Sequence, residues 1–189
     1  MTEAQRARRE AILSATMDLL GEREHGQIHM RDIAERSGVA LATLYRYFAS
    51  KELLYAHTVV SWGRAFGPAT QRLASGAASD RERMDQAFRR TIKAYERQPA
   101  FYRLIAALEV TQDREAHEVF QAFSSGYQAL LRDVLTDSEP DDAALIAQML
   151  LATLGAALRK WSLGDWPVAR VYDQMESAVD LMFRAPRAA

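Results

Sequence analysis

The side chains best suited to contact nucleic acid are concentrated in one short segment, residues 41–51. This segment offers hydroxyl, guanidinium and ammonium donors beside flat aromatic rings, and no carboxylate occurs between Glu35 and Glu52. Donors of this kind bind phosphate oxygens and the acceptors on base edges. The segment therefore predicts a DNA-contacting surface. Its candidate contact residues are Leu41, Ala42, Thr43, Tyr45, Arg46, Tyr47 and Lys51, and Ala40 directly before the segment is a further candidate.

Two short helices must position these side chains. Apolar periodicity predicts helices at residues 30–37 and 41–48, and helices this short are not stable alone, so they must pack on each other and on a preceding helix. Ala34 permits a close crossing, and Gly38 can adopt the left-handed conformation that a sharp turn requires. This pattern is typical of a helix-turn-helix. The shared core is expected to comprise Ile33, Val39, Leu44 and Phe48.

An ordinary amphipathic helix pair inside a bundle is the alternative interpretation of this segment. Tyr45 and Tyr47 weigh against it, because residues two apart lie roughly 200° apart on a helix and cannot both be core. The net charge does not distinguish the two interpretations, because residues 1–52 carry 8 of the 24 basic side chains of the chain and 8 of its 25 acidic side chains. A DNA footprint must therefore be local. We expect it to involve Arg6, Arg8, Arg9, Arg31, Arg46 and Lys51.

The segment from Met30 to Leu54 resembles the DNA-binding domain of the TetR family of bacterial transcriptional repressors. The resemblance is carried by the run Thr43-Leu44-Tyr45-Arg46-Tyr47-Phe48-x-Ser50-Lys51-Glu52-x-Leu54. The sequence Ala-x-x-Thr-Leu-Tyr-Arg-Tyr-Phe that begins at Ala40 is also similar to the corresponding sequence in the steroid-catabolism repressors of that family. A bacterial regulator that binds double-stranded DNA is the function this resemblance implies.

Individual roles follow from the same resemblance. It implies that Leu41, Ala42 and Tyr45 approach base edges. It places five further residues at phosphates: Arg31, Thr43, Arg46, Tyr47 and Lys51. Three alanines depart from the family's pattern. Ala40, at the start of the DNA-contacting helix, replaces a frequent Ser or Thr cap; Ala42 replaces a glycine, and Ala49 a proline. The operator sequence therefore does not follow from the motif.

The whole chain of 189 residues is expected to be all-α. Helical periodicity recurs throughout, and alternation typical of strands does not persist. We expect about nine helices, at residues 4–20, 30–37, 41–48, 51–66, 80–98, 100–111, 114–135, 141–163 and 167–183. Gly21 is the expected stop of the first helix, Ser50 and Asp80 are expected N-caps, and residues 73–79 a linker. The predicted domains are a three-helix DNA-binding domain at 1–50 and a ligand-binding and dimerisation domain at 51–189.

A homodimer is predicted from the last two helices. The helix at 141–163 has Leu145, Met149, Ala152 and Ala156 on one side, and Ile146, Leu150, Leu154 and Leu158 on the other. A helix that is apolar nearly all round is buried on two faces, and a four-helix interface between subunits would cover the second face. The final helix adds a stripe of Val168, Val171, Tyr172, Met175, Val179, Met182 and Phe183. The alternative is that both helices are internal to a monomer.

The resemblance also implies a ligand pocket in the second domain. Its predicted lining is Trp62, Phe66, Phe88, Tyr95, Phe101, Tyr102, Phe120, Phe123, Tyr127 and Trp161. Walls this apolar favour a bulky hydrophobic effector such as a sterol derivative, a fatty acyl compound or an aromatic drug. The helix at 51–66 would join the DNA surface at Lys51 to the pocket, so a ligand could shift it and respace the two DNA-contacting helices.

Other functions find less support in the sequence. There is no cysteine, and no zincin, nucleophile-elbow, Walker or dinucleotide glycine pattern occurs. His25 and His29 have i,i+4 spacing, but Gly26 between them favours a loop over a metal face. We therefore expect no enzyme, cofactor or metal site. A helical scaffold for apolar ligands or proteins, without DNA binding, is the alternative. No signal peptide or membrane span is expected, which predicts a cytoplasmic protein associated with the nucleoid.

Overall fold

The computed structural model describes residues 2–64 and 78–184. Its described residues form nine α-helices and one 3₁₀ turn and contain no strand, so the all-α prediction is confirmed. Two compact units divide the chain: residues 1–64 with 98–123, and residues 65–97 with 124–189. These units describe how the chain packs. The predicted boundary at residue 50, between a DNA-binding and a ligand-binding domain, concerns function and stays a prediction. Phe66 and most of the predicted linker lie outside the described residues.

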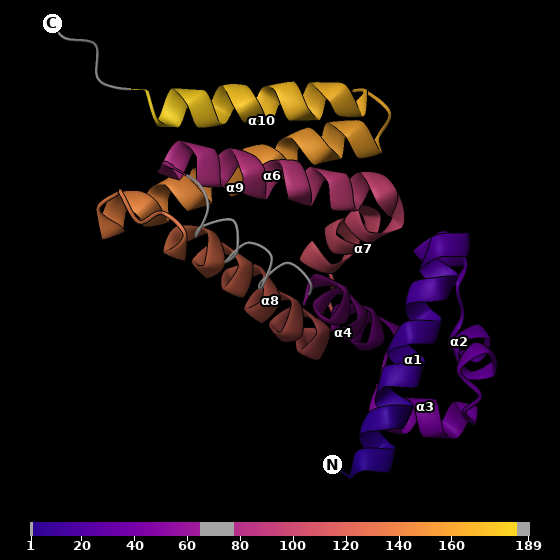
Figure 1. Ribbon diagram of the computed structural model, residues 1–189. Helices are drawn as coiled ribbons and strands as arrows, with labels where there is room; N and C mark the ends of the chain where they lie inside the picture. The colour runs from indigo at the N-terminus through magenta and orange to yellow at the C-terminus, as the bar shows by residue number, and fades with distance from the viewer. Residues whose placement is uncertain (1, 65–77, 185–189) are drawn as a thin grey trace, which may run out of the picture. The chain divides into compact units, whose positions relative to one another are not determined.

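The first unit consists of short helices packed around α1 (Glu3–Glu22). The 3₁₀ turn η1 (His25–Gln27) leads to α2 (Met30–Ser37) and α3 (Leu41–Tyr47). Figure 1 shows α2 and α3 beside α1, with α4 (Lys51–Gly63) following. Helix α7 (Pro99–Glu109) packs on α4, and the unit also includes the start of α8 (Arg114–Asp133).

Helix α1 does not stop at the glycine that the sequence suggested. It continues through Gly21 to Glu22, and Arg23, its C-cap, is extended with its N–H on the Leu19 carbonyl. Arg36 of α2 donates both guanidinium nitrogens to the Glu22 carboxylate, at 2.9 and 2.8 Å. This tertiary contact supports the last turn of α1, and no left-handed residue is needed there.

The second unit contains α6 (Asp80–Arg97), the end of α8, α9 (Pro140–Ser162) and α10 (Val168–Met182). Figure 1 shows α10 alongside α9 and α6. Met84, Phe88 and Ile92 give α6 a buried face at helical spacing. Asp80 does not cap α6 as predicted, because the hydroxyl of Ser79 accepts from the Glu82 N–H instead.

The Asp80 carboxylate forms a buried polar cluster with the turn between α8 and α9. It accepts from Arg83 Nη2 at 2.7 Å, from the main-chain N–H groups of Thr136 and Asp137 at 2.9 and 3.1 Å, and from the Ser138 hydroxyl at 2.6 Å. Arg83 also donates to Asp137, at 2.6 Å. Burial by itself raises the pKa of Asp80, but the hydrogen bonds from Ser138, Arg83 and Asp137 together hold that pKa below its ordinary value. The cluster therefore fixes the start of α6 to the α8–α9 turn.

Helix α9 has the two-sided character that the sequence predicted. Leu150, Leu154 and Leu158 are buried within the chain, whereas Leu145 and Met149 are 54% and 46% exposed. By length and composition α9 could cross a membrane. Its buried side makes it a core helix of the second unit. In the stripe predicted on α10, Val171, Met175 and Val179 are buried inside the same chain and stabilise the subunit itself. The other four residues of the stripe are half-buried: Val168, Tyr172, Met182 and Phe183.

Candidate nucleic-acid interface

The turn between α2 and α3 is built on one glycine. Gly38 is the C-cap of α2 and has φ 69° and ψ 23°, in the left-handed region that a side chain disfavours. Its N–H donates to the Glu35 carbonyl at 3.2 Å, and the Val39 N–H donates to the Ala34 carbonyl at 3.1 Å. These bonds close α2 and direct the chain sharply into α3. The predicted helix-turn-helix is confirmed.

Helix α3 presents its predicted contact residues on the outer side. Leu44 and Phe48 are fully buried and anchor the helix, whereas Tyr45 is 47% exposed. Ala40, Ala42 and Arg46 are exposed, and Leu41, Thr43 and Tyr47 are half-buried. The amphipathic division predicted from the spacing of the two tyrosines is therefore confirmed, with Tyr45 outward and Tyr47 partly packed.

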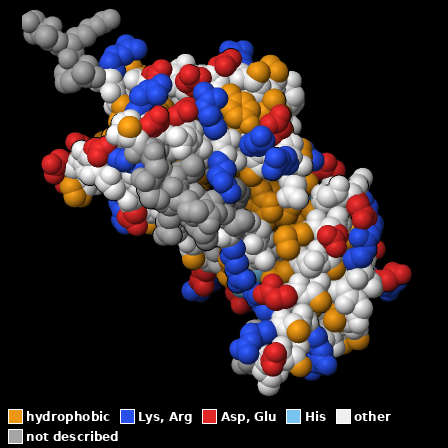
Figure 2. Space-filling model, in the orientation of Figure 1, with side chains coloured by type: hydrophobic (Ala, Val, Ile, Leu, Met, Phe, Trp, Pro, Cys, Tyr) orange, Lys and Arg blue, Asp and Glu red, His pale blue; other side chains and the backbone are white. Residues whose placement is uncertain are grey.

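Ala40 begins α3 without a side-chain cap. Its carbonyl accepts from the N–H groups of Thr43 and Leu44, at 2.8 and 3.0 Å, so the first turn is closed by the main chain alone. Arg31, near the start of α2, is exposed. Among the described residues neither Arg31 nor Arg46 forms an ion pair, so both guanidinium groups are available to phosphate. Figure 2 shows basic and acidic side chains interspersed on the visible face of the molecule, in line with the net charge of −1 of the whole chain.

Lys51 has a structural contact that the sequence did not indicate. Its half-buried ammonium donates to the Ile28 carbonyl at 3.2 Å and lies 5.7 Å from the centre of the Tyr55 ring. The Tyr55 hydroxyl donates in turn to the His25 carbonyl at 2.7 Å. An ammonium has three donors, so Lys51 can hold the loop before α2 and still reach a phosphate.

The histidines do not form a metal site within the described residues. His25 lies in η1, and its buried Nδ1 has no hydrogen-bond partner. His57 packs against Phe48, with ring centres 5.6 Å apart. Burial, and then the nearby charges of Arg9 and Arg64, lower the pKa of His57. His57 is therefore a half-buried residue that stays neutral near pH 7.

The residues predicted to line a ligand pocket are distributed over both compact units. In the first unit Trp62 stacks on Phe101, with ring centres 4.6 Å apart and planes 17° apart, and its indole N–H donates to Gln98 at 2.6 Å. Phe120 and Phe123 lie 6.5 Å apart. Phe101, Phe120 and Tyr102 are buried in this unit.

The remaining predicted pocket residues belong to the second unit. Phe88 is buried, and Tyr95 and Trp161 are half-buried. The Tyr127 hydroxyl lies 2.5 Å from the Thr91 hydroxyl, and burial raises the pKa of Tyr127 to about 12. Thr91 donates to the Ala87 carbonyl at 2.9 Å, so its oxygen is the acceptor for Tyr127.

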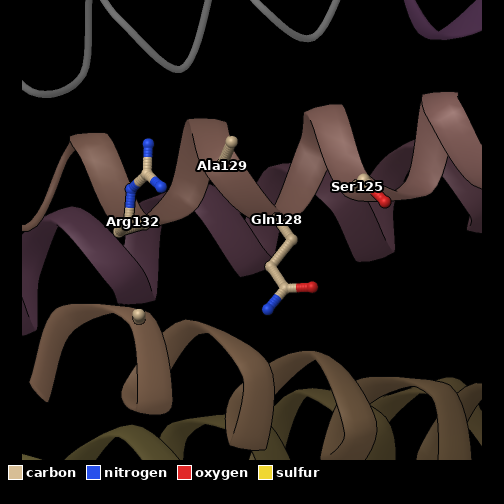
Figure 3. A pocket seen from close by; sticks show the side chains of 5 residues that line it. Ser125, Gln128, Ala129 and Arg132 are labelled. Atoms are coloured by element: carbon tan, nitrogen blue, oxygen red, sulfur yellow. The ribbon is translucent and has the colours of Figure 1, made fainter. Parts of the chain in front are cut away.

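A small cavity of about 130 Å³ lies between α8 and α9 in the second unit. Figure 3 shows the Gln128 side chain reaching from α8 toward the neighbouring helix, with Ser125 and Arg132 on the same helix. Ala129 and Ala144 complete the lining. Its volume is well below the roughly 300 Å³ of the smallest drug-sized sites. It contains none of the predicted pocket residues and is not the expected effector site.

An outward helix held by a glycine turn, with Arg46 in no ion pair among the described residues, defines a DNA-binding protein of the helix-turn-helix class. Comparison with known proteins identifies the family. Residues 12–58 match the model of the bacterial regulatory proteins of the tetR family, and residues 81–185 match the tetracyclin repressor-like C-terminal domain. The chain therefore belongs to the TetR family. It is a transcriptional regulator and not an enzyme.

Relatives of known name cover nearly the whole chain. The HTH-type transcriptional repressor KstR of Mycobacterium tuberculosis is 28% identical over 186 residues, which are 96% of this chain and 83% of that protein. KstR of Rhodococcus jostii is 27% identical over 187 residues, 96% of this chain and 85% of that protein. These matches support the predicted similarity to the steroid-catabolism repressors.

Solved structures share the fold. A TetR regulator from Rhodococcus sp. RHA1 superposes with a TM-score of 0.77 at 22% identity, covering 96% of this chain and 98% of that one. FadR from Bacillus subtilis, solved in complex with stearoyl-CoA, gives a TM-score of 0.69 at 20% identity, covering 93% of this chain and 97% of that one.

Proposed function

We propose that this regulator is a repressor that binds a palindromic operator as a homodimer and is released by a bulky hydrophobic effector. The observation that carries the proposal is the outer surface of α3, where Tyr45 and Arg46 are exposed above the buried anchors Leu44 and Phe48. Direct readout needs such a helix, because a base edge in the major groove is reached only by side chains that project from the protein.

The dimer is supported by the uncovered side of α9. Leu145, Met149, Ala152 and Ala156 recur at three- and four-residue intervals, and all four are exposed in the single chain. A second copy of α9 would cover this stripe in a self-complementary contact. A two-fold dimer would place two α3 helices about 34 Å apart, or at a multiple of that distance, as a palindrome requires.

The effector proposal depends on composition and on relatives. All ten predicted pocket side chains are aromatic, being phenylalanine, tryptophan or tyrosine, and nine of them belong to the described residues, since Phe66 lies outside. The similarity to the steroid-catabolism repressors and to FadR, which was solved with stearoyl-CoA, supports a ligand of sterol or fatty acyl character. A protein of this kind acts in the bacterial cytoplasm at the nucleoid and has no need of a membrane.

The dependence of DNA affinity on salt tests the DNA-binding proposal. The purified protein would first select a duplex from a randomised pool, and its affinity for that duplex would then be measured by fluorescence anisotropy at several salt concentrations. Arg46→Ala should reduce the slope of log affinity against log salt by about 1, because one phosphate contact is lost. Arg90→Ala, an exposed arginine of α6, is the matched control and should leave the slope unchanged. Failure to select any duplex would remove the proposal.

Sedimentation velocity tests the dimer. Met149→Arg places a charge in the middle of the exposed α9 stripe and should shift the protein toward monomer. Val110→Arg is the matched control, because Val110 is 72% exposed in the first unit and lies on another element. An equal effect of both substitutions, or of neither, would contradict the assignment of the α9 stripe.

A further inference from the structure

The N-terminus of α4 is connected by a side-chain hydrogen bond to a residue 63 positions later. The Ser50 hydroxyl donates to Oδ2 of Asp113, in the turn between α7 and α8. The same hydroxyl oxygen accepts from the Leu53 N–H at 3.0 Å, which makes Ser50 the N-cap of α4. A serine hydroxyl has a single proton, and here that proton goes to Asp113 because an ionised carboxylate can only accept.

The other oxygen of Asp113 serves α8. Oδ1 accepts from the Ala116 N–H at 3.0 Å, which caps the first turn of α8. One carboxylate therefore stabilises the positive ends of two helix dipoles, one directly and one through Ser50. These two hydrogen bonds, from Ala116 and then from Ser50, lower the pKa of Asp113, so the group is charged under ordinary conditions.

The connection lies beside the DNA-contacting residues. Ser50 directly precedes Lys51 and is separated from the buried Phe48 of α3 by a single exposed alanine, Ala49. On the other side, Lys51 holds the Ile28 carbonyl, just before α2. The start of α4 is thus fixed both to the DNA-contacting helices and to Asp113. The Ser50–Leu53 cap is local, whereas the Asp113 bond connects this turn to the α7–α8 turn, 63 residues away.

We propose that Asp113 is a positioning residue for DNA recognition, acting through Ser50 to hold the turn between α3 and α4. This inference rests on the proposed function. It concerns a residue far from the helix-turn-helix in sequence, which does not touch the outer surface of α3. A loosened turn would leave the cations in place but would misalign the side chains that must meet base edges.

Asp113→Ser is the informative variant. A serine at this position still caps α8, since serine and aspartate are comparable N-caps, but it has one oxygen and is too short to reach Ser50 as well. The substitution also removes a negative charge near the DNA, which by itself would strengthen binding. A loss of affinity therefore reports positioning and not charge.

The experiment compares the duplex that the wild-type protein selects from a randomised pool with a scrambled duplex of the same length. Asp113→Ser should weaken binding to the selected duplex by about tenfold, the effect of losing a hydrogen bond to a charged group. Binding to the scrambled duplex should be unchanged or slightly stronger. Thermal unfolding should show only the small loss expected for one hydrogen bond, because the α8 cap is retained.

A double-mutant cycle with Ser50→Ala completes the test. If Asp113 acts through Ser50, the double variant binds the selected duplex no more weakly than Ser50→Ala alone. Additive losses, equal weakening on both duplexes, or unchanged affinity of Asp113→Ser would each overturn the inference. These outcomes are distinguishable from failure of the proposed function, in which the wild-type protein itself would select no duplex.

Discussion

Replacing Asp80 with alanine removes the carboxylate that joins the start of α6 to the α8–α9 turn. The side chain is 3% exposed and accepts hydrogen bonds from one guanidinium, two main-chain N–H groups and one hydroxyl. Breaking a buried ion pair by removing one partner typically costs about 3–5 kcal/mol. Arg83 keeps its bond to the more exposed Asp137 and is not fully orphaned, so we expect the lower end, about 3 kcal/mol.

Urea unfolding followed by circular dichroism measures this loss. With an m-value of about 1–3 kcal/mol per molar urea, the midpoint should fall by about 1 M or more. Arg81→Ala is the matched control, because Arg81 pairs with Asp180 in an exposed position and its loss should shift the midpoint little. Equal midpoints for the two variants would refute the assignment of Asp80 as the main connection.

The pH dependence gives an independent check of Asp80. Its pKa is lowered in the folded protein, so its contribution is fully present above the unfolded value of 3.8 and is lost as pH falls through the lower folded value. The stability difference between wild type and Asp80→Ala should therefore narrow only in strong acid. A constant difference from neutral to acidic pH would show that charge is not what the alanine removes.

Four further substitutions have expected outcomes. Gly21→Ala should stabilise the protein by about 0.4–1 kcal/mol, because Gly21 is helical with open space around it. Gly63→Ala should destabilise it by about 1–3 kcal/mol, because the new Cβ would collide with the Phe123 ring. Thermal unfolding of the two variants checks the opposite signs. The pKa of His57 is lowered in the folded protein, so the stability that its neutral form provides is complete above about pH 6.5 and falls as the pH drops below that value. His57→Gln should therefore make the free energy of unfolding less dependent on pH between neutral and mildly acidic conditions. An unchanged pH dependence in this variant would contradict the role given to His57. Lys51→Ala should reduce the salt slope of DNA binding by about 1, and an unchanged slope would leave Lys51 with only its contact to the loop before α2.

Much of the DNA-contacting element was predictable because its determinants are local. The spacing of Leu44 and Phe48 fixes which side of α3 is buried, and Gly38 specifies the turn through its own backbone freedom. The Ser50 cap of α4 was likewise readable, since the hydroxyl and the Leu53 N–H that it accepts are three residues apart. Signals of this kind act within about one helical turn.

Predictions that required knowledge of distant partners were less successful. Gly21 resembled a helix stop, but the contact between Glu22 and Arg36 extends α1 past it. Asp80 resembled a cap, but its carboxylate turns to residues more than fifty positions away. Val171, Met175 and Val179, which belong to the α10 stripe predicted to form an interface, are buried inside the subunit. In each case the sequence indicated the character of the residue, but it did not indicate which distant residues it contacts.

The amino-acid sequence by itself determined the helices, the glycine turn and the outward row of donors on α3, since periodicity and backbone freedom are properties of neighbouring residues. Only the tertiary structure decided what the remaining polar groups do. Ser50 and Asp113 are 63 residues apart, and the bond between them exists because packing of α4, α7 and the start of α8 in one unit brings the two caps together. No local pattern encodes that pairing, because it depends on the summed packing of helices that are distant along the chain.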